Sequence, residues 1–385
     1  MAAYTTIDDP EVYFQVVTWN GNADTNAVTF GGETDMQPDL IWGKDTSGDR
    51  HFLADAVRGK TGTGYYLLAS NNNESDTSNA PPDGITSIDS NGFTLGANTS
   101  NTNGGWSYEI NEDKDNGQGN SGKYVAWCWK AGTSFSNDAS ATSVGSIDSD
   151  GSINTTSGVA IIRWSGTGAN ATIAHGIAAP KVMLIKRISG GTESWVVYHQ
   201  EISPAKHLFI NNTDAENADT NNFQNTATTS SVFSVGTYNQ MNASGTNNMI
   251  AYCFAEKQGF SKFGKYTGNG SADGVFCHTG FKPAWVMTKR TDSTGNWSLF
   301  DHRRTGSTKG STIGKANPME LLLHPDLSNA EANVSDGGYS IDGVSNGFKI
   351  KSSSATINAS GGTYIYMAFA EAPFVNSNGV PCNAR

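Results

Sequence analysis

One series of landmarks occurs three times along this chain of 385 residues, and this internal repeat restricts the possible folds more than any other feature of the sequence. Each copy opens with a strand-like segment that carries an aromatic residue and ends in a Gly-rich turn. These opening segments span residues 16–22, 161–168 and 263–270. A second strand then follows a proline, at Pro38, Pro180 and Pro283. Because proline at the first residue of a strand loses no ladder hydrogen bond, the pattern predicts strands throughout.

Each copy also closes on a strand rich in aromatic residues, at 124–129, 249–254 and 364–369. Cys128 and Cys253 occupy the same position of this closing strand, and Ala368 fills that position in the third copy. A position that takes either Cys or Ala predicts a small buried side chain, with the thiols reduced rather than in disulfides. Trp195 and Trp297 recur at the start of an intervening strand, so we interpret them as core residues.

The repeat predicts three units, at residues 1–133, 134–258 and 259–385. Each unit has the usual size of a β-sandwich. We therefore expect an all-β fold of tandem antiparallel β-sandwiches, of the jelly-roll, concanavalin-like kind. Residues 133–158 are rich in Ser, Thr, Asn and Asp, which predicts a linker with a small hairpin around Ser149-Asp150-Gly151. Pro318 to Leu323 is the one segment where we expect a short turn of helix.

The three closing strands are apolar at nearly every position rather than at alternate positions. A sandwich strand with one face in water alternates between apolar and polar residues. Continuous apolarity therefore indicates that both faces are covered, by a neighbouring unit, by another subunit, or by loops laid over a curled sheet. A homotrimer and a single chain whose three units form a pseudo-threefold body both agree with this pattern.

Composition excludes several classes of protein. The 9 Trp, 13 Tyr and 17 Phe are too many for a disordered chain. A net charge of −11 argues against binding to nucleic acid, which requires a basic face. No apolar run approaches the roughly 18–20 residues of a membrane span. Residues 1–10 lack a basic region and an apolar region, so we expect no signal peptide and synthesis and folding in a cytoplasm.

Motifs for metals and cofactors are missing. Asp113 begins a segment that starts like a calcium loop, but an EF-hand needs Gly at position six and Glu at position twelve. Those positions hold Gln118 and Tyr124. The segment around Asp148 is shorter and predicts an ordinary turn. We therefore expect no bound metal and no cofactor.

Catalytic motifs are missing as well. The chain contains no HExxH, GxSxG or GxxxxGK[ST] sequence. His175 and His278 each lie five residues before a repeat proline, and we interpret both as turn residues that bond to main-chain carbonyls. A glycosidase needs two converging carboxylates, whereas the acids at 109–115 (Glu109, Glu112, Asp113 and Asp115) are interpreted as a solvated loop. We therefore expect no enzymatic activity and no catalytic residues.

Glycan binding is the remaining chemistry that the composition favours. Glycans are held by aromatic faces together with polar groups from loops. Aromatic residues outside the repeat pattern are the better candidates for such contacts, because recurring aromatic residues are expected in the core. These candidates are Trp106, Tyr108, Tyr65, Tyr66 and Tyr238.

Several segments resemble a known family. They are AYTTIDDP at 3–10, YVAWCWKAG at 124–132, AYCFAE at 251–256, FKPAWVM at 281–287 and MAFAEAPF at 367–374. As a set, and over essentially the whole chain, they resemble tail-fibre-like virion proteins of marine bacteriophages. The resemblance implies repeated lectin-like sandwiches in a virion appendage. It transfers no catalytic residues, because the shared segments are strands.

The resemblance leads us to expect a bacteriophage virion protein. The preferred function is a component of a tail fibre or tail appendage that binds the host cell surface. The alternatives are a capsid-surface decoration, knob or head-fibre protein and, more remotely, a polysaccharide depolymerase. The expected partners are other virion proteins, of the tail or the capsid, and a glycan or protein of the host surface, with no nucleic acid and no membrane insertion.

Overall fold

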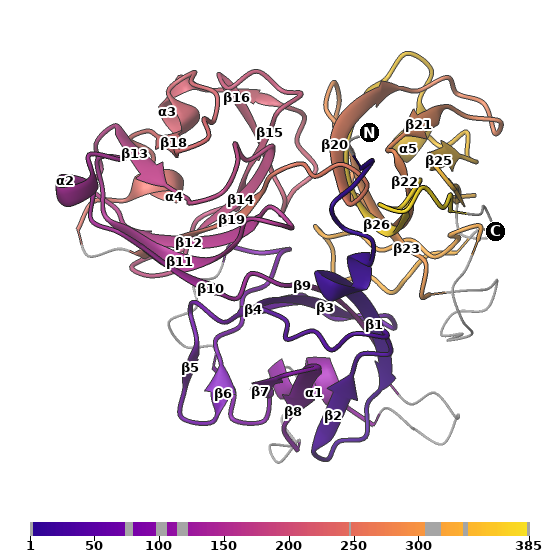
Figure 1. Ribbon diagram of the computed structural model, residues 1–385, viewed down its shortest axis with the longest axis horizontal. Coiled ribbons are helices and arrows are strands. Elements are labelled where there is room, and N and C mark those ends of the chain that lie inside the picture. The colour runs from indigo at the N-terminus through magenta and orange to yellow at the C-terminus, as the bar shows by residue number, and fades with distance from the viewer. Residues whose placement is uncertain are drawn as a thin grey trace.

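The protein folds into three lobes arranged around a common centre (Figure 1). This computed structural model describes residues 3–73, 80–97, 106–113, 122–245, 248–304, 317–333 and 338–382. The sheets in these residues are antiparallel, and the α-helices are only four to six residues long. The predicted all-β fold is therefore confirmed.

The first lobe pairs a four-stranded sheet with a smaller one. The main sheet has the order β1 (Phe14–Asn20), β9 (Lys123–Trp129), β3 (Leu40–Asp45) and β4 (His51–Asp55). The small sheet has the order β2 (Asn26–Thr29), β8 (Gly92–Leu95) and β7 (Ile85–Asp89). Its remaining elements are η1 (Pro10–Val12), β5 (Lys60–Thr61), β6 (Gly64–Tyr65) and α1 (Trp106–Asn111).

The second lobe has the widest sheet, of eight strands. Their order is β10 (Thr133–Asn137), β11 (Ser149–Asn154), β12 (Val159–Ser165), β19 (Asn248–Phe254), β14 (Val182–Arg187), β15 (Val196–His199), β16 (Lys206–Phe209) and β17 (Asn217–Ala218). A two-stranded sheet pairs β13 (Ala171–Ala174) with β18 (Val232–Val235). The helices are α2 (Ala139–Thr142), α3 (Thr220–Phe223) and α4 (Asn239–Asn242).

The third lobe again pairs a four-stranded sheet with a three-stranded one. The main sheet has the order β20 (Ser261–Thr267), β26 (Thr363–Pro373), β22 (Phe281–Arg290) and β23 (Ser298–Asp301). The small sheet has the order β21 (Phe276–His278), β25 (Gly347–Ile350) and β24 (Ile341–Val344). One short helix, α5 (Ala355–Asn358), precedes β26.

The same strand order occurs in all three main sheets: opening strand, closing strand, second strand, third strand. Cys128, Cys253 and Ala368 each pair with the second residue of their opening strand, and all three are fully buried. The prediction of a small buried side chain at this position is confirmed. The strand orders do not fix where one unit ends and the next begins, so the unit boundaries stay predictions.

Three local predictions differ from the structure. Residues 133–158 are not a free linker, because they supply β10 and β11, which pair in register with each other and with β12. Ser149-Asp150-Gly151 lies inside β11 rather than at a turn. Most of β11 is only half buried, so its composition resembles that of a loop. Pro283 lies inside β22 at an irregularity of register, which is another place where sheets accept proline.

Pro318 to Leu323 forms no helix. Met319, Leu322 and Leu323 instead make isolated bridges, to Ile341, Ala332 and Leu299 respectively. The side chains of Met319, Leu321, Leu322 and Leu323 are all buried. An extended segment covered on both faces has the continuous apolar pattern that a buried helical turn also has, so the pattern alone does not separate the two.

The closing strands separate two layers of core, which explains their continuous apolarity. Alternate residues face the common centre: Val125, Trp127 and Trp129 in β9, Ile250, Tyr252 and Phe254 in β19, and Ile365, Met367 and Phe369 in β26. The residues between them face the core of their own lobe: Tyr124, Ala126 and Cys128, then Met249, Ala251 and Cys253, then Tyr364, Tyr366 and Ala368. Neighbouring lobes therefore cover the second face. A homotrimer of this chain stays a prediction.

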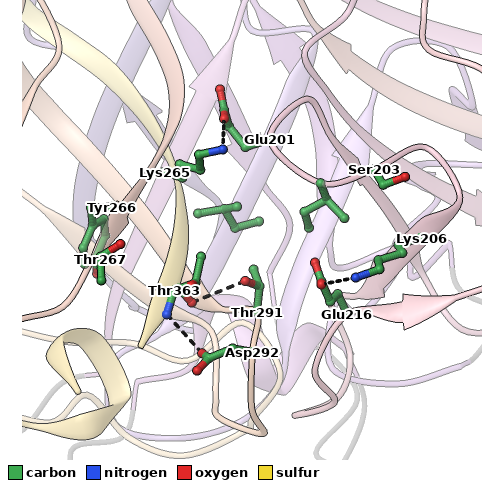
Figure 2. A pocket seen from close by; sticks show the side chains of 12 residues that line it. Glu201, Ser203, Lys206, Glu216, Lys265, Tyr266, Thr267, Thr291, Asp292 and Thr363 are labelled. Atoms are coloured by element: carbon green, nitrogen blue, oxygen red, sulfur yellow. Dashed lines mark hydrogen bonds and ion pairs between the residues drawn. The ribbon is translucent and has the colours of Figure 1, made fainter. Parts of the chain in front are cut away.

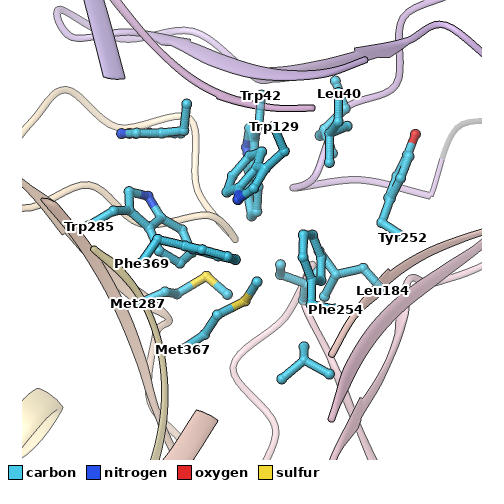
Figure 3. Packing of buried hydrophobic residues seen from close by; sticks show 14 of the residues in the cluster. Leu40, Trp42, Trp129, Leu184, Tyr252, Phe254, Trp285, Met287, Met367 and Phe369 are labelled. Carbon is cyan, nitrogen blue, oxygen red and sulfur yellow. The ribbon is translucent and has the colours of Figure 1, made fainter. Parts of the chain in front are cut away.

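Three aromatic side chains meet at the centre of the molecule (Figure 3). Trp129, Phe254 and Phe369 occupy the same position of their closing strands. Their ring centroids are 5.8 Å apart between Trp129 and Phe254, 5.5 Å between Trp129 and Phe369, and 5.8 Å between Phe254 and Phe369. This nearly equilateral cluster marks a pseudo-threefold axis. Trp195 and Trp297 belong to the same buried core, as predicted.

Candidate functional site

Equivalent hydrogen bonds join the lobes at three seams. A fully buried lysine near the end of each second strand donates to a main-chain carbonyl of the next lobe. The pairs are Lys44 with Ser328, Lys186 with Asn73 and Lys289 with Thr213, at N···O distances of 3.5, 3.0 and 3.1 Å. A buried ammonium group must be hydrogen-bonded to be tolerated. Each lysine also donates to a carbonyl of its own lobe, of Asp45, Glu193 or Gly295, so the seam bond adds a partner in the next lobe to an ammonium group held on both sides.

A ring nitrogen at the start of each third strand makes a second set of seam contacts. The pairs are His51 with the carbonyl of His324 (3.1 Å), Trp195 with that of Ala69 (2.8 Å) and Trp297 with that of Phe209 (2.9 Å). Both sets run in one direction, from the first lobe to the third, the third to the second and the second to the first. The lobes therefore form a closed ring with pseudo-threefold symmetry.

A polar cavity of about 680 Å³ lies at the seam between the second and third lobes (Figure 2). The second lobe supplies the loop after β15, the first residue of β16 and Glu216 just before β17, and the third lobe supplies the ends of β20 and β22 and the start of β26. The cavity is lined by Glu201, Ile202, Ser203, Lys206, Glu216, Lys265, Tyr266, Thr267, Thr291, Asp292, Thr363 and Ile365.

Ion pairs organise the charged groups around this cavity. Lys265 of the third lobe pairs with Glu201 of the second at 3.1 Å, so this pair crosses the seam. Lys206 pairs with Glu216. The side chains in both pairs are partly exposed, and exposed pairs stabilise proteins by only about 0–1 kcal/mol. Their atoms are therefore free to exchange partners when a polar ligand enters.

Asp292 is held more firmly. Its carboxylate pairs with Arg290 at 2.9 Å and accepts a hydrogen bond from the main-chain N–H of Thr363 at 3.1 Å. The hydrogen bond from Arg290 lowers the pKa of the Asp292 carboxyl. Asp292 is therefore suited to accept hydrogen bonds and not to donate a proton.

Among the described residues that line it, the cavity has little apolar surface and no open aromatic platform. Ile202 and Ile365 line the cavity but are only 5% and 3% exposed, because both belong to the common core. Tyr266 stacks on Tyr364 with centroids 4.9 Å apart, and its hydroxyl donates to the carbonyl of Ile357 at 2.7 Å. These contacts fix the tyrosine within the core of the third lobe. The carboxylates, ammonium groups and threonine hydroxyls of the cavity suit a ligand that carries many hydroxyl groups.

A second cleft of about 680 Å³ lies beside β11 in the second lobe. It is lined by Ser146, Ile147, Asp148, Asp150, Arg163, Trp164, Ser165, Thr167 and Asn248. Asp150 and Arg163 face each other across the pair of strands β11 and β12 and form an ion pair at 2.8 Å. The Asp148 carboxylate accepts from the main-chain N–H of Ala139 at 2.8 Å, at the start of α2. Asp148 therefore does not belong to a simple turn.

Of the five aromatic residues predicted to bind glycan, Tyr65, Tyr66 and Tyr238 have described side chains, and these three line neither space. Tyr65 and Tyr66 are half buried in the first lobe, where Lys60 lies over the Tyr65 ring, 5.8 Å from its centroid. Tyr238 is 39% exposed in the second lobe, and a hydrogen bond to Asp219 raises the pKa of its hydroxyl. Tyr238 thus lies in a different lobe from the other two, so the structure gathers them into no single site.

Trp106 and Tyr108 belong to helix α1, but their side chains lie outside the described residues. The calcium-loop segment after Asp113, including Asp115 and Gln118, also lies outside them. Glu109 was wrongly interpreted as solvated, because it is buried and pairs with Arg50 at 2.7 Å.

The two repeated histidines have different surroundings. His175 is buried, its Nδ1 accepts from the main-chain N–H of Ile177, and its Nε2 donates to the carbonyl of Thr229 at 3.2 Å. Burial lowers its pKa to about 4, so it is neutral near pH 7. The predicted bond to a carbonyl is confirmed for His175. His278 is exposed at the end of β21 and does not share this environment.

The charged residues of the seam cavity were missed in the sequence. They come from separate loops and strands of two lobes, and no short motif joins them. The sequence carries one indication of these charged positions: Arg163 and Lys265 are both the fifth residue of an opening strand, so a basic residue recurs at the same position of two repeats. In the described part of the chain, no three His, Cys, Asp or Glu side chains gather as a metal site. No helix described there is long and apolar enough to cross a membrane.

A family model described as a domain of unknown function (DUF7483) matches residues 9–373. The match begins just before η1 and ends with β26, so it spans all three lobes. No curated protein and no solved structure matches the chain.

Proposed function

The chain belongs to the DUF7483 family, whose function is unknown, and from its geometry we propose that it is a non-catalytic binding protein of a bacteriophage virion. In this proposal it is part of a tail fibre or tail appendage and attaches to a glycan of the host cell surface. The resemblance to tail-fibre-like proteins suggests the virion, and the structure supplies the argument for glycan binding.

The polar cavity at the seam of the second and third lobes carries the proposal. Glycans present many hydroxyl groups and a few apolar C–H faces, and sites that bind small molecules combine polar groups with apolar surface. The cavity offers carboxylates that accept from hydroxyl groups and ammonium groups that donate to them. Ile202 and Ile365 line it but are almost fully buried, so polar contacts to hydroxyl groups carry the proposal.

The closed ring of lobes supports binding without rearrangement. The walls of the cavity come from two lobes, and buried contacts such as Lys289 with Thr213 and Trp297 with Phe209 fix these lobes relative to each other. A site that is already formed loses little conformational entropy when a ligand binds.

The pairing of the carboxylates favours binding over cleavage. Each cavity carboxylate has a basic partner: Glu201 with Lys265, Glu216 with Lys206 and Asp292 with Arg290. A glycosidase needs one carboxyl group with a raised pKa as its general acid. At Asp292 the hydrogen bond from Arg290 has the opposite effect and lowers the pKa of the carboxyl group.

Adsorption of labelled protein to host cells tests this proposal. Ser203 is exposed at the rim of the cavity, so Ser203→Trp fills the opening. We expect this variant to bind host cells at least about tenfold more weakly than the wild type. Ser230→Trp places the same bulk on an exposed loop elsewhere in the second lobe and serves as the control. Equal binding by the wild type and Ser203→Trp contradicts the proposal, and loss of viscosity of host polysaccharide would indicate a depolymerase instead.

The pseudo-threefold body favours a second candidate, a decoration protein or knob on the capsid surface. A body with three similar lobes matches the threefold-related positions of a capsid lattice. Antibody-gold labelling of intact virions separates the two candidates. Label on the tail supports the host-binding appendage, and label on the head supports the capsid protein.

A further inference from the structure

We infer that the cleft beside β11 is a second saccharide site, equivalent in its strand positions to the seam cavity and selective, like it, for a neutral saccharide. This inference rests on the proposed glycan-binding function and adds to it a second site and a class of ligand. It makes the protein bivalent towards a polysaccharide.

The two sites are built on the same positions of the repeat. Arg163 and Lys265 are each the fifth residue of an opening strand and point to the same side of their sheets as Ile161 and Phe263, which belong to the common centre. Each cation pairs with a carboxylate from another element. Arg163 pairs with Asp150 at 2.8 Å, and Lys265 pairs with Glu201 at 3.1 Å.

The neighbouring positions also correspond. The last residue of each opening strand bears a hydroxyl group, Ser165 in one site and Thr267 in the other. Each pairs in register with the first residue of its closing strand, Asn248 or Thr363. All four residues line their respective spaces. A cation and two adjacent polar groups are thus placed alike, although the opposite wall comes from a second lobe in one site and from β11 in the other.

The charges at the two sites define the class of ligand. The seam cavity has three carboxylates, of Glu201, Glu216 and Asp292, and two ammonium groups, of Lys206 and Lys265. The cleft beside β11 has two carboxylates, Asp148 and Asp150, and one guanidinium group, Arg163. In the seam cavity the three carboxylates are balanced by Lys265, Lys206 and Arg290, which pairs with Asp292. The cleft beside β11 carries one more negative than positive charge. Neither site has an excess of positive charge that would attract an acidic sugar, so both favour neutral sugars.

Two sites on one rigid body have a consequence for affinity. A polysaccharide repeats its units, so one polymer can occupy both sites. Binding at the second site then becomes intramolecular and strengthens overall attachment by orders of magnitude. Loss of either site should therefore weaken binding to the polymer strongly.

The test uses the full chain and polysaccharide extracted from the host surface, separated into neutral and acidic fractions and immobilised on a sensor. The variants are Lys265→Ser, Arg163→Ser, Asp150→Ser and the double variant Lys265→Ser/Arg163→Ser. Lys349→Ser removes a partly exposed lysine that pairs with Asp273 in the third lobe and lines neither site, and serves as the control. Thermal unfolding confirms that each variant folds.

We expect binding to the neutral fraction, and a loss of affinity of about 10- to 100-fold for each single variant at either site. The double variant should not bind, and the control should bind like the wild type. The second site is refuted if Arg163→Ser and Asp150→Ser bind like the wild type while Lys265→Ser is weakened, a result that leaves the proposed function intact. Preference for the acidic fraction refutes the ligand class. Absence of wild-type binding to both fractions overturns the second site together with the proposed function.

Discussion

Single positions show how the three lobes differ within one pattern. Asn211 accepts a hydrogen bond from the main-chain N–H of Trp195 at 2.9 Å, and Asp326 accepts the equivalent bond from Trp297 at 3.1 Å. The third lobe thus has a buried carboxyl group where the second has a neutral amide. Burial raises the pKa of Asp326 to about 7. Lys289 is the cation that faces it, and Asp214 of the second lobe also acts on this lysine.

The raised pKa of Asp326 predicts a pH-dependent stability. The folded pKa of about 7 lies above the unfolded value of about 3.9, so the group's stabilising contribution is complete below about pH 4 and is lost as the pH rises through 7. Between pH 5.5 and 8 the wild type should lose about 2 kcal/mol more stability than Asp326→Asn. Burial lowers the pKa of Lys289 to about 8, so that group acts mainly above this range. Denaturant unfolding at both pH values measures the difference.

Asn211→Asp provides the matched control for this prediction. It places a carboxyl group at the equivalent position of the second lobe and should introduce a pH dependence of the same sign. If Asp326→Asn keeps the full pH dependence of the wild type, another group is responsible for it.

A second prediction at this scale concerns the aromatic cluster at the centre. Phe369 packs against Phe14, Trp129 and Phe254. Phe369→Ala should lower the free energy of unfolding by about 3–5 kcal/mol, because truncation leaves a cavity that the three lobes cannot close. Phe276 is 48% exposed, so Phe276→Ala should change stability by less than about 0.5 kcal/mol. Urea unfolding of both variants checks this contrast, and equal effects would contradict the packing argument.

At the scale of elements, sequence reasoning succeeded where the repeat was apolar and failed where it was polar. The opening, second and closing strands were predicted because each buries at least one face. The strands β10 and β11 were predicted as a linker because they lie at the edge of the second sheet with much of their surface in water. The seam cavity could not be predicted, because the pairing of Lys265 with Glu201 depends on how two lobes dock.

A glycine substitution tests whether β11 is a structural strand. A Cβ atom at Gly151 would overlap the carbonyl oxygen of Ile161 on β12. Gly151→Ala should therefore separate the two strands and cost about 1–3 kcal/mol of stability. Nothing lies within 4 Å of a Cβ atom at Gly31, so Gly31→Ala is the control. Thermal unfolding compares the two, and a neutral Gly151→Ala would mean that the segment behaves as the linker first expected.

At the scale of the whole molecule, the closed ring predicts cooperative unfolding. The three lobes share one core and are joined at every seam. The N-terminal segment also ties the first lobe to the third, since Tyr4 donates to the carbonyl of Gly280 at 2.7 Å and Thr5 to that of Gln258 at 2.8 Å. In Figure 1 this segment runs from the third lobe down to β1. Each lobe therefore lacks a complete core when it is separated from the other two.

We expect calorimetry of the wild type to show one transition whose calorimetric and van't Hoff enthalpies agree. Phe369→Ala should shift this transition as a whole rather than split it. Separate transitions for single lobes would contradict the shared core.

The pseudo-threefold ring also bears on how such a protein evolves. In a homotrimer every mutation appears at all three interfaces at once, so an improvement at one is imposed on the others. Here a single gene encodes three distinct seams, and each can vary independently. Two differences between the lobes illustrate this. The third lobe has the carboxyl group of Asp326 at the position where the second lobe has the amide of Asn211, and the second lobe has additional strands. A trimer of identical chains could not have acquired such differences in one lobe at a time.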